Sequence, residues 1–167
     1  MMRTLYLINI TLHVLAAMFW LGGMFFLGLI GAPVLRGIDP PSLRQKLFNE
    51  LGVRFRAAGW IAIALLIATG FGNLQFRGWL QWESVLGSGA FWSTTAGRML
   101  ALKLVAVTTM VVVSAVHDFA LGPAAFRVEA GSEPAIALRR RAALLARINA
   151  LLGIVVVVAA VSLARFG

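Results

Sequence analysis

Four long apolar segments alternate with shorter polar segments along this chain. The apolar segments cover approximately residues 5–34, 57–76, 99–121 and 143–164. A helix needs roughly 20 apolar residues to cross a hydrocarbon core of about 30 Å. Each segment meets that length, and none alternates with the period of two that a strand of a membrane β-barrel requires. The pattern therefore predicts four transmembrane helices.

The composition also indicates a membrane protein. The 167 residues are 60% hydrophobic and only 13% charged, which is too little charge to cover a soluble domain of this length. We expect an all-α integral membrane four-helix bundle that forms a single transmembrane domain over residues 1–167. The first apolar segment is far longer than the apolar region of a signal peptide, about 7–15 residues, so we expect it to remain as a helix.

The polar segment after the first predicted helix has a pattern of its own. It opens with "DPPS" at residues 39–42, which is typical of a turn and a helix N-cap. Leucines and Phe48 then alternate with basic residues. We expect a short amphipathic helix here that lies on the anionic cytoplasmic leaflet.

The segment between the second and third predicted helices is rich in tryptophan. Its aromatic residues include Trp79, Trp82, Phe91 and Trp92. Clustered tryptophans are typical of an aromatic belt at the membrane interface, so we expect an aromatic loop at the outer interface. The alternative is that the loop covers a quinone or lipid pocket.

The fifteen lysines and arginines predict an orientation. Ten lie in the segments that join the first helix to the second and the third to the fourth, four lie on the other side, and Lys103 lies within a helix. By the positive-inside bias, both basic segments are cytoplasmic and both termini lie outside, in a bacterial-type inner membrane. Because the charge follows topology, we expect no nucleic-acid partner.

Few ionisable side chains lie within the apolar segments. They are His13, Lys103 and, close to a boundary, His117 with Asp118. Such groups are costly in hydrocarbon and usually face the interior of a bundle, so each is a candidate site residue. Counting at 1.5 Å per residue places His13 and Lys103 in the same outer half, and His117 in the inner half. Lys103 and His117 lie about 21 Å apart on one helix face and cannot bind one ion together.

The chemistry of these residues leaves two kinds of site open. A neutral imidazole at His13 is a good ligand for haem iron or copper, and Trp20 follows two turns later on the same stripe. Lys103 as an ammonium calls for an anion, such as a haem propionate or a substrate carboxylate. The chain has no cysteine, so a metal would need nitrogen, oxygen or methionine sulfur, as at Met24 and Met110.

Structural roles are the alternatives to these chemical ones. His13 would make an interhelical hydrogen bond to a serine or threonine, such as Thr94 or Thr95. Lys103 would extend to the outer interface. Asp118 would pair with Arg56 or Arg147 at a polar helix end, and the methionines would serve as packing residues.

Several short motifs, in order along nearly the whole chain, resemble a known superfamily. They are "LHVLAAMFWLGGMFF" with His13 and Trp20, "RFRAAGWIAIALLIATG", "GRMLALKLVAV" with Lys103, and "RRAALLARINALLGIVVVVAAV". Together they resemble the CopD and HemJ superfamily of small membrane proteins. HemJ-like members are associated with b-type haem and with oxidation of protoporphyrinogen, and the resemblance implies that His13 and Lys103 correspond to their functional pair. CopD-like members are associated with copper uptake or resistance, and "HDFALGP" at residues 117–123 resembles that branch.

We predict that the outer half of the bundle holds a b-type haem, with His13 as an axial ligand. Trp20 and Met110 would contact the cofactor, and Lys103 would pair with a propionate or act as a catalytic group near the iron. The function would be electron transfer with a membrane quinone, or a HemJ-like oxidoreductase activity on a porphyrinogen.

Two alternatives come from other functional classes. One is a copper uptake or resistance transporter, with His13, Met24 and Met110 as contacts and His117 as an inner metal site. The other is a structural subunit of a larger membrane complex. Besides membrane lipid, the expected partners are therefore a quinone or porphyrinogen, a second copy of the chain or a larger membrane complex.

Overall fold

A computed structural model describes residues 1–129 and 131–166 of the chain. Within those ranges every regular element is helical, which confirms the predicted all-α fold. The elements are α1 (Met2–Phe26), the π-turn η1 (Leu27–Gly31), α2 (Ala32–Arg36), α3 (Pro41–Phe76), the π-turn η2 (Trp82–Leu86), α4 (Gly89–Ser93), α5 (Thr95–Ala115), the π-turn η3 (Val116–Leu121), α6 (Gly122–Phe126) and α7 (Glu133–Phe166).

Four helical spans are long and apolar enough to cross a membrane. They cover Met2–Arg36, Pro41–Phe76, Thr95–Ala125 and Glu133–Arg165. Each is longer than its apolar segment, because the polar residues at its ends continue the helix instead of breaking it. The predicted four-helix membrane fold is confirmed.

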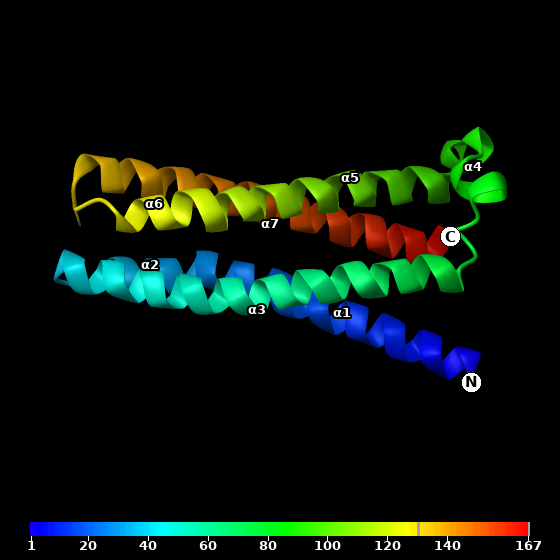
Figure 1. The fold of residues 1–167 in the computed structure, drawn as a ribbon, viewed down its shortest axis with the longest axis horizontal. Helices are drawn as coiled ribbons and strands as arrows, with labels where there is room; N and C mark the ends of the chain where they lie inside the picture. Colours follow the sequence, from blue (N-terminus) through cyan, green and yellow to red (C-terminus); the bar gives the residue numbers. More distant parts are fainter. Residues whose placement is uncertain (130, 167) are drawn as a thin grey trace.

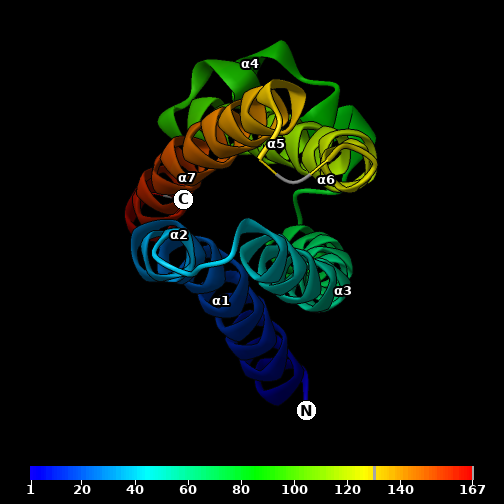
Figure 2. The same cartoon turned by 90° about the vertical axis from the view of Figure 1, so that its left-hand side faces the viewer.

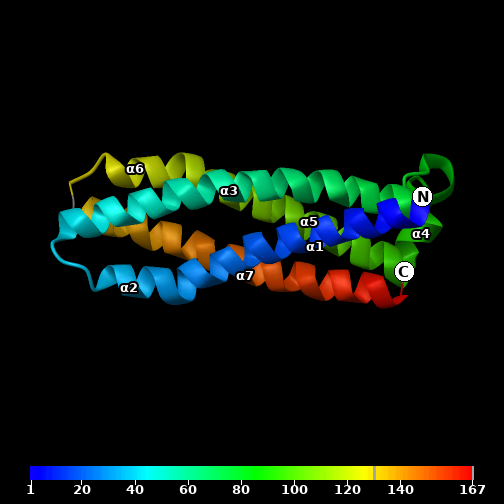
Figure 3. The same cartoon turned by 90° about the horizontal axis from the view of Figure 1, so that it is seen from below.

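The spans form two antiparallel hairpins, one of α1 with α3 and the other of α5 with α7 (Figure 1). Viewed from one end, the hairpins face each other, with α7 beside the first span and α6 beside α3 (Figure 2). Both chain termini and α4 lie at the same end of the bundle, which we call the terminal end (Figure 3). The turns that follow α2 and α6 lie at the opposite end, which we call the basic end.

The outer surface of the bundle is made of large apolar side chains. Leu29, Ile61, Val105 and Val161 are each more than 60% exposed, with exposed fractions of 73%, 72%, 66% and 63%. In water such a surface would be unfavourable, whereas in a bilayer it contacts lipid chains. Specific packing is therefore confined to the narrow interior between the helices.

Two of the π-turns directly precede a proline. Ala32 donates its backbone N–H to the carbonyl of Leu27, and Gly122 donates to the carbonyl of His117, each five residues back. Pro33 and Pro123 follow, and proline disfavours the α conformation in the residue before it and has no N–H to donate. The first and third spans thus widen in the same way as they approach the basic end.

The segment predicted as a short amphipathic helix is helical, but it is not a separate element. It forms the first part of α3, which runs unbroken over 36 residues from Pro41 to Phe76. Gly52 is the one glycine between this part and the apolar span, and a single glycine is tolerated inside a helix. The amphipathic part therefore extends the second span toward the basic end.

The aromatic loop at the terminal end packs mainly against itself. The ring centroid of Phe91 lies 5.4 Å from that of Trp79 and 5.2 Å from that of Trp92. Trp92 donates its indole N–H to the backbone oxygen of Leu86 at 2.8 Å, while Trp82 is 73% exposed. The loop is an ordered cap with one tryptophan left free for the membrane interface.

The junction between α4 and α5 generates a first prediction. Thr94 caps α5 by accepting the backbone N–H of Gly97 at 3.0 Å, and a Cβ atom at Gly97 would overlap the carbonyl group of Phe91. Because backbone cannot move aside as a side chain can, Gly97→Ala should lower the free energy of unfolding by about 1–3 kcal/mol. Thermal unfolding in detergent micelles measures this effect.

Gly89→Ala provides the matched control, since a Cβ atom at Gly89 would have no neighbour within 4 Å. Its melting temperature should stay at the wild-type value or rise slightly, because alanine favours a helix. Equal melting temperatures for the two variants would contradict the packing described for the cap.

Candidate functional site

A polar cluster joins α1 to α3 in the half of the bundle nearer the terminal end. Asn9 donates its side-chain N–H groups to the backbone oxygen of Thr69 at 3.0 Å and to Asn73 Oδ1 at 2.9 Å. His13, one turn further along α1, has Nδ1 2.8 Å from Thr69 Oγ1. Polar groups in hydrocarbon are costly unless they pair, so this cluster fixes how α1 faces α3.

The hydrogen bonds of Thr69 define the tautomer of His13. The Thr69 hydroxyl donates its hydrogen to the backbone oxygen of Leu65 at 2.6 Å. Its oxygen must then accept a hydrogen from His13 Nδ1. The second ring nitrogen, Nε2, keeps a lone pair that can bind a metal or accept another hydrogen bond.

The interhelical hydrogen bond of His13 therefore exists, but its partner is Thr69 and not Thr94 or Thr95. Thr94 instead caps α5 at the terminal end. Counting residues from the ends of the helices gives the depth of His13 in the membrane but does not identify its partner. Thr69 lies in an apolar run of α3, and the sequence does not show which helix that part of α3 faces.

Lys103 on α5 and His13 on α1 belong to different hairpins and interact electrostatically. The charge of Lys103 acts on His13, and the charge of Arg77 acts on Lys103. Among the residues that the structure describes, Lys103 has no hydrogen bond or ion pair to a protein group. An ammonium group with a second cation nearby and no carboxylate partner is suited to an anionic ligand.

Trp20 and Met110 do not join His13 and Lys103. The Trp20 ring packs against α3, where a Cβ atom at Gly59 would lie 3.6 Å from it. Met110 is only 2% exposed, and its methyl group faces Gly153 on α7. By helical rise Met110 lies about 10 Å from Lys103, further toward the basic end.

A second polar cluster joins η3 to α3 in the basic half. His117 Nδ1 lies 2.8 Å from Asp118 Oδ1, and Trp60 donates its indole N–H to Asp118 Oδ2 at 3.0 Å. Arg56 donates to the backbone oxygen of Asp118 at 2.7 Å. The expected side-chain pair between Asp118 and Arg56 is therefore replaced by one with Trp60, because Arg56 binds the widened backbone of η3.

The acceptor at Asp118 orients His117. An ionised carboxylate only accepts hydrogen bonds, so His117 donates from Nδ1, and in the neutral imidazole the lone pair then lies on Nε2. A carboxylate behind a histidine is the arrangement that orients metal-binding imidazoles. The His117 side chain is 40% exposed, so its free nitrogen can be reached from outside the bundle.

A third group of donors lies between these two clusters. Asn149 on α7 donates to Ser114 Oγ on α5 at 2.8 Å and faces Met24 Sδ on α1 at 3.8 Å. Asn149 and Ser114 are both buried. The interior thus carries polar groups at three depths, and each group joins two or three helices.

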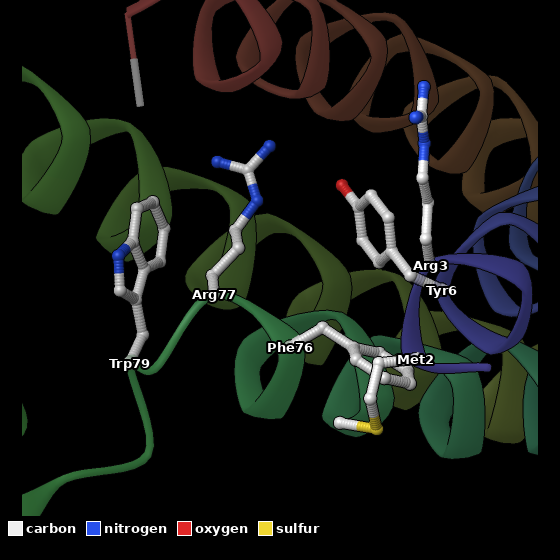
Figure 4. Close-up of a pocket in the computed structure, with 6 residues that line it drawn as sticks. All are labelled: Met2, Arg3, Tyr6, Phe76, Arg77 and Trp79. Carbon is white, nitrogen blue, oxygen red and sulfur yellow. The ribbon is translucent and has the colours of Figure 1, made fainter.

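A pocket of about 660 Å³ opens at the terminal end between α1 and the end of α3. It is lined by Met2, Arg3, Tyr6, Phe76, Arg77 and Trp79. Figure 4 shows the polar ends of Arg3, Tyr6 and Arg77 projecting to the same side. The pocket does not include His13 or Lys103, although Arg77 connects the two regions by acting on the charge of Lys103.

Within the described ranges, no group of three or more His, Cys, Asp or Glu side chains could hold a metal ion together. A metal site there would need ligands of other kinds as well, such as methionine sulfur or amide oxygen. Such neutral ligands suit a soft monovalent ion such as Cu(I) better than a hard divalent one.

The sequence reasoning missed the amide and hydroxyl members of these clusters. Asn9 precedes His13 by four residues, and Thr69 precedes Asn73 by four, so both pairs show a helical repeat of polar positions. That spacing was a usable signal. The sequence predicts the ionisable groups, Trp20 and the methionines as candidate residues, and it does not single out neutral polar groups such as Asn9 and Thr69.

A family model matches most of this chain. The model describes copper resistance protein D, CopD, and it matches residues 50–163, which include most of α3 and all of α5. The chain belongs to the CopD family. The CopD-like part of the resemblance is thereby confirmed, and the HemJ-like part stays a prediction.

Similar proteins add little about the function of this CopD family member. An uncharacterized protein from Aquifex aeolicus (strain VF5) is 46% identical over 63 residues, which cover 37% of this chain and 43% of the relative. The matched part thus spans less than half of the relative's length. No solved structure matches the chain.

The hydrogen bond between His13 and Thr69 generates a second prediction. Thr69→Val keeps the side-chain shape but removes the acceptor, which leaves the His13 N–H unpaired inside the bundle. We expect the free energy of unfolding to fall by about 1–2 kcal/mol. Thermal unfolding in detergent measures the loss.

Thr109→Val is the control, because the Thr109 hydroxyl is exposed and bonds only to the backbone of its own helix, at Val105. This change should alter the free energy of unfolding by no more than about 0.5 kcal/mol. The assigned role of Thr69 is wrong if both variants unfold at the same temperature.

Proposed function

We propose that this membrane protein binds copper inside the helical bundle and passes it across the membrane. The observation that carries the proposal is the CopD family match over residues 50–163. The interior donors support it, since thioether, imidazole and amide groups are ligands that Cu(I) accepts. Copper is the cargo in this proposal and not a resident cofactor.

The charge of the interior favours a copper path in the basic half. Lys103 and Arg77 place two cations in the terminal half, where they repel a copper ion. Asp118 places a carboxylate in the basic half, next to His117. Copper contacts are therefore better assigned to Met24, Met110 and His117 than to His13.

His117 would be the exchange site at the end of this path. In the neutral imidazole its Nε2 carries the lone pair, because Asp118 accepts the hydrogen on Nδ1, and its side chain is partly exposed. By the positive-inside bias the basic end faces the cytoplasm, so His117 would exchange copper with cytoplasmic acceptors.

Copper movement into liposomes tests this function. Purified protein is reconstituted into vesicles that contain a Cu(I) indicator, and the rate of Cu(I) entry is measured under reducing conditions. Wild type should exceed protein-free vesicles, and His117→Ala should slow entry about tenfold because its ligand nitrogen is lost.

Thr109→Val serves here as the matched control and should conduct at the wild-type rate. Wild-type vesicles that take up copper no faster than protein-free vesicles would overturn the proposal. A His117→Ala rate equal to wild type would remove His117 from the path.

A second function is supported by His13 and Lys103. The free Nε2 of His13 fits one axial position of a haem iron, and the unpaired ammonium of Lys103 fits a propionate. When bound, haem would supply one-electron redox chemistry. His13 would hold the iron in the orientation set by Thr69, and Lys103 would neutralise the propionate.

An optical spectrum tests the haem function. Protein purified from haem-sufficient cells should show reduced b-type bands and stoichiometric iron, and His13→Ala should lose both. Trp20→Phe should retain the bands, because Trp20 packs on Gly59 away from His13. A colourless wild-type preparation without iron would exclude this function.

A further inference from the structure

Three helices meet at one place near the middle of the bundle. Gly153 on α7 leaves room for Leu21 of α1 and for the methyl group of Met110 on α5. One turn away on α7, Asn149 faces Met24 of α1 and Ser114 of α5. The absence of a side chain at Gly153 lets α1 and α5 approach α7 closely enough for these contacts.

One polar atom at this place has no partner. Asn149 is 4% exposed, and its Oδ1 is buried with no hydrogen-bond donor among the described residues. Both Nδ2 hydrogens are used, one on Ser114 Oγ and one toward Met24 Sδ. An unsatisfied buried acceptor is unfavourable, so a group that can bind to it is favoured.

We propose that Met24, Asn149 and Ser114 form a binding site for Cu(I) in the middle of the membrane. The ligands would be the Met24 thioether and the Asn149 amide oxygen, with the Ser114 hydroxyl as the adjacent polar group. This inference rests on the proposed copper function and names the interior site through which the ion would pass.

The spacing of the two main ligands fits a metal ion. A half-turn of the Asn149 amide about its last side-chain bond exchanges oxygen and nitrogen, which places the oxygen 3.8 Å from Met24 Sδ. With metal–sulfur and metal–oxygen bonds of about 2.3 and 2.1 Å, the lengths found for zinc, an ion bound to both spans about 3.8 Å at an angle near 120°. That angle is the one expected for three ligands in a plane.

The amide rotation would bring the unused oxygen into use. In the arrangement without the ion, Asn149 directs nitrogen toward Met24 and Ser114, and the oxygen has no partner. In the arrangement with the ion, the oxygen would bind the cation and could accept the hydrogen of the Ser114 hydroxyl, while the nitrogen would give up its bonds to Ser114 Oγ and Met24 Sδ. The same side chain thus serves both states without movement of the backbone.

The neutral ligands select for charge and softness. No carboxylate belongs to this group, so a divalent ion would keep most of its charge uncompensated in hydrocarbon, while a monovalent ion would keep less. Thioether sulfur prefers Cu(I) to hard cations. His117 follows Ser114 by three residues on the same span, about 5 Å further toward the basic end, so the ion would have a ligand nearby to move to.

Direct measurement of Cu(I) binding tests the site. The assay uses purified protein in lipid nanodiscs and a competing Cu(I) chelator under anaerobic conditions. A His117→Ala background isolates the interior site from the exchange site. In that background we expect about one bound Cu(I), with sulfur among its nearest neighbours by X-ray absorption.

Two substitutions remove the ligands. Met24→Leu removes the sulfur and preserves volume, and Asn149→Leu removes the amide oxygen. Each should weaken Cu(I) binding by about tenfold or more. Met18→Leu is the matched control, because Met18 lies on the same helix but is 66% exposed to lipid, and it should bind as the background protein does.

The outcomes separate this site from the wider function. If Asn149→Leu fails to fold, Met24→Leu still decides the question, since leucine fits methionine positions with little strain. If wild type moves copper into vesicles but Met24→Leu binds Cu(I) as tightly as the background protein, the interior site is wrong and the function stands. Unchanged Cu(I) binding in Met24→Leu is also the result expected if a water molecule, and not an ion, binds the Asn149 oxygen. If wild type neither binds nor transports Cu(I), both the proposed function and the proposed interior site are wrong.

Discussion

The arrangement of the bundle depends on the need of each polar side chain to find its partner inside the protein. Hydrocarbon offers no hydrogen bonds, so a polar group that faces lipid costs several kcal/mol. Asn9 therefore pairs with Asn73, Trp60 with Asp118, and Ser114 with Asn149, each across two helices. These pairs determine which face of each helix turns inward. Apolar packing alone could not do so, because lipid is as apolar as the helix surface.

The interior charges divide the bundle into two chemically different halves. Arg77, together with Lys103 when it carries its proton, makes the terminal half favourable for anions, whereas Asp118 with His117 makes the basic half favourable for cations. A copper ion and an anionic group such as a propionate would accordingly occupy different depths. The two functions considered for this chain are for that reason compatible in space, and the family match gives direct support to copper.

The sequence was sufficient for the architecture because hydropathy over 20 residues records whether a helix crosses a membrane. It also placed His13 and Lys103 at similar depth, since helical rise is constant. It could not identify Thr69 as the partner of His13, because depth does not say which helices are neighbours or how each is rotated. It also began the second span too late and divided α3, because the polar residues before Ala57 were read as a boundary although none of them stops a helix.

The unused oxygen of Asn149 could not be predicted in the same way. Its state depends on three helices at once, through Ser114, Met24 and the space left at Gly153. The sequence contains each of these residues, but it does not show that they contact one another in the folded bundle. The groups proposed to bind a ligand in this bundle are therefore the ones that the pattern of a single helix predicts least well.

The widened turns before Pro33 and Pro123 also affect how the chain can change in evolution. Each turn holds one residue more than an α-helix of the same rise would need, so it resets the angular phase between the parts of the span on either side. Deleting one residue within η3 would therefore restore an ordinary helix and leave Met110 and Ser114 facing the same way relative to the part beyond Pro123, whereas a deletion in a plain α-helical part of the span would rotate the two sides by about 100°. The turn therefore acts as a register element, at which the span can lose a residue and still keep its interior faces aligned.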